Sequence, residues 1–406
     1  MIAPDRSTLA PAARVLGPLC LAAAFECAGW ILLAQPGVLL GSWYGRAALL
    51  QGVHALTLGA LALSVTGAGW QLVPVVTARP WSPALAPWVN RGLILGLLAM
   101  LPAFSRPSGA LAVAGLTLVL SSLLLRSALV LPALLRVTGR AGPRLWLIGA
   151  ELSLWLGLGL GLALWLGRAG HPVLTDPIGA LTWHVRALLG GWLAGWMIGT
   201  GSLLIPMFAV SREPEPRALL GAGALWIAGL ATGLTALWAL GLVMGGAGVA
   251  LSLSRGARRG PALAQAGVGV LGLALFAALS PLGWLAPDAI VTGALALGAL
   301  PLLRGVAQRI LPFLAWTHAY GANMRGAPPV SRLGAERLGA LSGALGLAGG
   351  AAVLASRIWP SETLGRAGAW IAALGALLHL LLLARALLLG WLGQNRGQAL
   401  AGTERA

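Results

Sequence analysis

The sequence is dominated by long apolar stretches, each about as long as an α-helix that crosses a lipid bilayer. Roughly 20 mostly apolar residues span the hydrocarbon core, and the 406-residue chain can be divided into twelve such stretches. Inside a bilayer the backbone must satisfy its own hydrogen bonds, so this pattern predicts an all-α polytopic membrane protein. The predicted spans are 15–35, 53–77, 91–105, 109–135, 145–167, 183–210, 218–234, 236–254, 262–282, 288–314, 335–355 and 367–392.

The boundaries of the third, seventh and eighth spans are the least defined. The seventh and eighth are expected to form a tight hairpin, with its turn near Thr232 or around 245–248. Ten or fourteen helices fit the pattern less well than twelve. No signal-peptide cleavage site follows the first apolar stretch, so the first helix is expected to remain as a membrane anchor.

The charged residues are few and are distributed unequally between the two predicted faces of the membrane. Only 9% of the residues are charged, and the net charge is +17 because 27 basic residues, all of them Arg, outnumber 10 acidic ones. A soluble enzyme needs a more charged surface, and the Arg residues are too dispersed to form a nucleic-acid-binding face. With twelve spans, 21 Arg residues fall on the side of the N-terminus and 6 on the other. By the positive-inside rule both termini are cytoplasmic, and the expected location is a bacterial inner membrane.

An internal repeat divides the predicted helices into three groups of four. A Gly is followed seven residues later by a Pro in GAGWQLVPVV, in GTGSLLIPMF and in GVAQRILPFL, near the same end of the second, sixth and tenth helices. His54 precedes the first of these Pro residues by 20 positions, and His184 precedes the second by 22. These intervals predict three pseudo-repeated units within one membrane domain, at 15–135, 145–254 and 262–392.

Three four-helix units with His at the outer ends of even helices resemble the haem–copper oxidase subunit I superfamily, and in particular its NnrS-like and related twelve-helix members. The resemblance rests on HALTLGALALSVTGAGWQLVPVV, HVRALLGGWLAGWMIGTGSLLIPMF and RILPFLAWTHAYG. It implies haem and copper binding linked to respiratory or nitric-oxide-related redox chemistry. It places His54 at a haem-ligand position and His184 at a copper-ligand position, and Arg186 can bind a haem propionate.

Other positions depart from the oxidase pattern. Residues 218–245 contain no His pair for copper, and 288–293 contain no His for haem. The copper ligand set is therefore incomplete, standard oxygen reduction is not expected, and no residue is assigned to catalysis. If the chain is an enzyme, the resemblance makes it a membrane oxidoreductase, and it implies partners among respiratory-complex subunits or cytochromes.

Two acidic residues lie in the first helix of a predicted unit. A carboxylate in lipid is costly, so Glu26 and Glu151 are expected to face the interior and to be paired or protonated. Arg186 is the expected partner of Glu151 or Asp176. His379 lies in the middle of the last helix, where it is expected to hydrogen-bond to another helix.

Two other classes of function remain open. Twelve helices with internal repeats also suit a membrane transporter or channel, although such proteins usually have two six-helix halves. The missing His residues in the later helices favour a catalytically silent structural or assembly subunit of a membrane complex.

Overall fold

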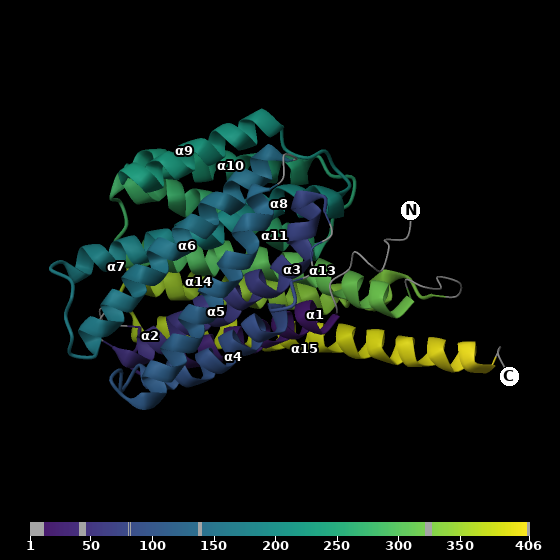
Figure 1. The fold of residues 1–406 in the computed structure, drawn as a ribbon, viewed down its shortest axis with the longest axis horizontal. Helices are drawn as coiled ribbons and strands as arrows, with labels where there is room; N and C mark the ends of the chain where they lie inside the picture. The colour runs from purple at the N-terminus through teal and green to yellow at the C-terminus, as the bar shows by residue number, and fades with distance from the viewer. Residues whose placement is uncertain are drawn as a thin grey trace.

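The computed structural model describes residues 12–39, 46–79, 81, 83–136, 140–320 and 327–403. In these ranges the chain is helical throughout its regular elements and forms no strand. The helices lie side by side in a single bundle, and α15 extends beyond the others at one end (Figure 1).

All twelve predicted stretches are helical, which confirms the all-α membrane architecture. Nine of them are continuous helices: α1 (Ala12–Leu33), α4 (Ala86–Ala103), α5 (Ala110–Leu135), α6 (Ala141–Arg168), α9 (Pro216–Thr232), α10 (Thr235–Ser254), α11 (Pro261–Leu279), α14 (Glu336–Ile358) and α15 (Glu362–Thr403). Short 3-10 turns, η4 (Ser280–Leu282) and η6 (Val330–Arg332), follow α11 and precede α14.

The other three stretches are composite helices, each with a π-helical segment between two α-helical parts. They are α2 (Ala47–His54), η2 (Ala55–Ala62) and α3 (Leu63–Thr77); α7 (Pro177–Val185), η3 (Arg186–Leu193) and α8 (Ala194–Ala209); and α12 (Pro287–Gly293), η5 (Ala294–Ala299) and α13 (Leu300–Tyr320).

Eleven of the helices in the described ranges are long and apolar enough to cross a membrane. The twelfth, α9, has 17 residues, or about 26 Å at 1.5 Å per residue, slightly less than the roughly 30 Å hydrocarbon core. It packs along α10. Gly233, with a φ of 77°, ends α9 in the left-handed conformation, which confirms the predicted turn near Thr232 and excludes the one at 245–248, which lies inside α10.

The π-helical segments recur in the same register as the Gly and Pro residues of the sequence repeat. The segment η2 ends 12 residues before Pro74, η3 ends 13 residues before Pro206, and η5 ends 13 residues before Pro312. These Pro residues lie within α3, α8 and α13. The recurrence agrees with the predicted repeat, but the grouping into three four-helix units itself stays a prediction.

The second, sixth and tenth helices supply much of the bundle interior. A cavity of about 70 Å³ is bordered by residues of α3, α8 and α13 together with Leu19 of α1. Large indole rings fill the space around α6, α8 and α9, where Trp146, Trp196 and Trp226 are buried. The helices at the periphery expose Leu, Ile and Trp side chains, as expected for contact with lipid.

Two Arg residues do not lie where the charge distribution predicted. Arg126 and Arg304 were assigned to the membrane face of the termini, but both are buried inside the bundle, with 0% and 2% of their surface exposed. Each is paired with a carboxylate, Glu151 for Arg126 and Glu26 for Arg304. The assignment was wrong because a charge inside a long apolar helix can be neutralised by a neighbouring helix, which a single span does not show.

Candidate functional site

The two His residues singled out by the sequence lie next to π-helical segments. His54 is the last residue of α2, directly before η2. His184 lies in α7, two residues before η3. Segments of this kind occur frequently at functional sites, because they change the direction in which neighbouring side chains point.

His54 and His184 line the same cavity, although they are 130 positions apart in the sequence. The cavity has a volume of about 150 Å³. Its wall is mostly aliphatic and aromatic and includes Trp165 and Trp192, while Arg168 brings a positive charge to it. The structure thus brings both predicted site residues to one apolar space.

Backbone carbonyls fix the orientation of both imidazole rings. Nδ1 of His54 lies 2.8 Å from the carbonyl oxygen of Leu50, and Nδ1 of His184 lies 2.9 Å from that of Gly157. A carbonyl oxygen only accepts hydrogen bonds, so Nδ1 carries the proton in each ring. In the neutral ring this leaves the Nε2 lone pair free to bind a metal, which is the arrangement common among metal-ligating His residues.

Residues of α4 and α6 hold the rings in place. The ring of Phe104, which follows α4, lies 4.7 Å from His54 and 4.9 Å from Trp165, between ring centroids. Gly161 makes room for His184, because a Cβ at this position would lie 2.8 Å from Cε1 of the imidazole. Gly161 therefore leaves the space that the imidazole of His184 occupies.

The structure places Arg186 outside the lining of this cavity. Its guanidinium donates to Oγ1 of Thr235 at 2.8 Å and to the carbonyl of Gly233 at 3.3 Å. It also lies 5.0 Å from the ring of Trp183. The cation that lines the cavity is Arg168, which directly follows the span predicted at 145–167 and was not singled out by the sequence.

The expected partners of Arg186 are also wrong. Glu151 accepts from Arg126 at 2.6 Å, and Asp176 caps α7 by accepting from the backbone N–H of Gly179 at 2.9 Å. Arg126 was overlooked because it lies in the preceding helix, α5, whereas sequence proximity favoured a residue near His184.

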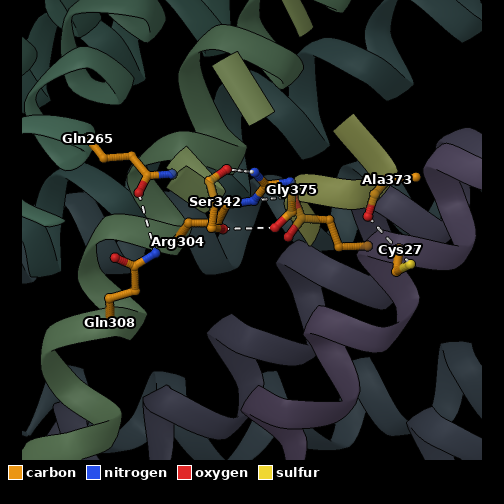
Figure 2. Close-up of polar contacts among 8 residues, drawn as sticks. Cys27, Gln265, Arg304, Gln308, Ser342, Ala373 and Gly375 are labelled. Carbon is orange, nitrogen blue, oxygen red and sulfur yellow. Dashed lines mark hydrogen bonds and ion pairs between the residues drawn. The ribbon is translucent and has the colours of Figure 1, made fainter. Parts of the chain in front are cut away.

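Glu26 belongs to a second buried polar cluster, centred on Arg304 (Figure 2). Oε1 of Glu26 accepts from Nε of Arg304 at 2.8 Å and pairs with Nη2 at 2.7 Å. This confirms the expectation that both membrane carboxylates face the interior and are paired.

The cavity offers a small set of metal-binding groups. Over the ranges that the structure describes, no three His, Cys, Asp or Glu side chains come together as a metal site. His171 lies in an exposed loop, and neither His318 of α13 nor His379 of α15 lines the cavity. Of the His, Cys, Asp and Glu side chains that the structure describes, those lining the cavity are therefore two imidazoles from different helices.

No family model matches the sequence, and no curated protein matches it.

Proposed function

We propose that this multi-pass membrane protein binds one haem between His54 and His184 and serves respiratory or nitric-oxide-related redox chemistry. One observation carries the proposal. The two imidazoles line the same apolar cavity, and each uses Nδ1 for a backbone hydrogen bond, so that its Nε2 lone pair is available to a metal. A six-coordinate haem uses two axial ligands of this type.

The residues around the cavity fit haem in their chemistry. The apolar wall suits the macrocycle, and the guanidinium of Arg168 suits a propionate, which it can bind with two parallel hydrogen bonds. A cavity of about 150 Å³ holds a benzene-sized guest, so a whole porphyrin requires lining side chains such as Leu58, Leu120 and Leu188 to rotate outward.

Each residue of the site has a defined task in this proposal. A bound haem supplies one-electron transfer. His54 and His184 would hold the iron through their Nε2 atoms. The apolar wall excludes water, and Arg168 offsets negative charge on the ligand. A respiratory-complex subunit or a cytochrome would be the electron-transfer partner.

Copper is less well supported than haem. A copper site of the resembled type uses three imidazoles, and two line this cavity. We therefore assign no reaction step to copper.

The distribution of Arg supports an inner-membrane location with both termini in the cytoplasm. With Arg126 and Arg304 inside the bundle, the topology predicted from the sequence still assigns 19 Arg residues to the face of the termini and 6 to the other. The excess is still the pattern of the positive-inside rule.

Absorption spectroscopy of the purified protein tests the proposal. Protein produced with ample haem should show a Soret band, a reduced-minus-oxidised difference spectrum of a low-spin haem, and about one haem per chain. Protein that carries no haem under these conditions would contradict the proposal.

A transporter or channel is the second candidate, and the two buried ion pairs favour it. Ionisable residues inside a membrane often mark the path of an ion or substrate. Uptake of a solute by vesicles containing haem-free protein would select this function over the first.

A further inference from the structure

A chain of polar side chains leads from one end of the bundle to the Glu26–Arg304 pair. Gln308 of α13 donates to Oε1 of Gln265 in α11 at 3.5 Å. One turn before Gln308, Arg304 donates to Glu26 at 2.8 Å and to the carbonyl of Ser342 at 3.3 Å. Figure 2 shows the Gln265–Gln308 pair next to the cluster around Arg304 and Ser342.

One face of α14 is built to leave space for this chain. Gly339, Gly343 and Gly346 are spaced by four and three residues and so lie on one side of the helix. A Cβ would lie 2.7 Å from Oε1 of Gln308 at the first position and 2.8 Å from Oε1 of Gln265 at the second. At Gly346 it would collide with Nη1 of Arg304. The glycines therefore accommodate the polar groups.

The chain of polar side chains begins at Gln308, close to a charged surface. Gln308 is half-buried, and its neighbour Arg309 lies 3.8 Å from Glu336 in an ion pair with exposed fractions of 31% and 63%. Glu336 is the first residue of α14. The Gln308 end of this chain of side chains thus faces the side of the bundle where α11 and α14 begin.

Two buried polar atoms of the chain have no hydrogen-bond partner within the described part of the protein. They are Nε2 of Gln265 and Nδ1 of His379, and the two residues are only 5% and 2% exposed. His379 lies on α15 one turn after Gly375, whose carbonyl accepts from Ser342 at 2.8 Å. An unsatisfied buried polar atom costs about 1–3 kcal/mol, and buried water commonly provides the missing partner.

We propose that bound water molecules complete this chain into a hydrated passage that links Gln308 with Glu26 and His379. The ligand at Gln265 Nε2 and His379 Nδ1 is water, because water can both accept from the amide and donate to or accept from the imidazole. A metal ion is a poorer occupant, since no cluster of three ligating side chains exists among the described residues.

This inference stands independently of the haem proposal. None of the residues in the passage lines the cavity of His54 and His184. Removal of haem should therefore leave the passage unchanged. Evidence against the passage would not be evidence against the haem site.

Radiolytic hydroxyl labelling in ¹⁸O-water tests the passage in the intact protein in detergent. Radicals formed from bound water modify adjacent side chains, so His379 should incorporate ¹⁸O several-fold faster than Trp226. Trp226 is the internal control, because it is fully buried and its indole N–H already donates to Gly190.

Variants then locate the water. Gln265→Leu removes the amide that holds it, and labelling of His379 should fall to the level of Trp226. Gln308→Leu, at the surface end of the passage, should slow the exchange of ¹⁸O-water into the position next to Gln265. If Gln265→Leu does not fold, Gly343→Ala provides a second variant that displaces the same amide. Labelling of His379 at the level of Trp226 in the unmodified protein, or labelling unaffected by the folded variants, would overturn the proposal.

Discussion

Nη1 of Arg126 lies 2.6 Å from Oε1 of Glu151, and neither side chain is exposed. The same oxygen accepts from the indole N–H of Trp196 at 2.7 Å. The guanidinium also lies 4.5 Å from the centroid of the Trp196 ring, in a cation–π contact. These contacts join α5 to α6 and α8, the helices at the boundary between the first two predicted units.

Removal of one member of this pair should destabilise the protein strongly. Glu151→Gln or Arg126→Met leaves a buried charge without its counter-ion, which typically costs about 3–5 kcal/mol. The double variant should recover part of this loss. Equilibrium unfolding in detergent measures the changes.

The exposed pair of Arg140 and Glu213 is the control for this prediction. Its atoms lie 3.1 Å apart, and the side chains are 41% and 54% exposed. Exposed pairs contribute about 0–1 kcal/mol, so Glu213→Gln should have a small effect. Equal effects of Glu151→Gln and Glu213→Gln would show that the buried pair has no special role.

Replacement by alanine should lower the stability of the protein at one glycine of α9 and not at another. A Cβ at Gly229 would collide with the backbone nitrogen of Trp238 in α10, whereas a Cβ at Gly221 meets nothing within 4 Å. Overpacking costs about 1–3 kcal/mol, so Gly229→Ala should destabilise the hairpin. Gly221→Ala should be neutral or stabilising by up to about 1 kcal/mol. Thermal unfolding of the two variants compares them, and a stable Gly229→Ala protein would refute the close packing of α9 on α10.

The topology predicts which loops reach each side of the membrane. Alkaline phosphatase inserted after Gly170, between α6 and α7, should be active because it is exported. The same enzyme inserted after Arg258, between α10 and α11, should be inactive because this loop lies with the termini. The reverse pattern would show that the orientation inferred from the Arg residues is wrong.

Two further glycines, both in α6, test the positioning of His184. Gly161→Ala places a Cβ 2.8 Å from the imidazole, while a Cβ at Gly159 meets nothing within 4 Å. Displacement of a ligand's orienting contacts commonly costs about 10–100-fold in affinity, so Gly161→Ala should bind haem more weakly. Gly159→Ala should retain normal occupancy in a haem titration. Equal affinity in both variants would argue against His184 as a ligand.

The sequence predicted the helices well because twelve apolar stretches leave a membrane chain few alternatives. The repeated Gly and Pro residues also drew attention to the three helices that contain π-helical segments. The segments themselves were not predicted, since one additional residue per turn produces no distinct pattern in a uniformly apolar sequence.

The candidate site was only partly predictable. The sequence singled out His54 as a haem-ligand position and His184 as a copper-ligand position, and the structure brings both residues to one cavity. The roles of Arg168 and Arg126 depend on contacts between helices that are distant in sequence, so the residues nearest to His184 gave a wrong pairing. For the same reason no local motif indicated that Arg304 reaches Glu26, 278 positions away.

The most direct measurement is the reduced-minus-oxidised spectrum of His54→Ala and His184→Ala, with His171→Ala as control. His171 lies in an exposed loop outside the cavity, so its variant should keep the full haem signal. Each of the other two variants should lose the low-spin spectrum or shift it toward that of a five-coordinate haem. A low-spin spectrum that is unchanged in both folded variants would contradict the assignment of His54 and His184 as the ligands.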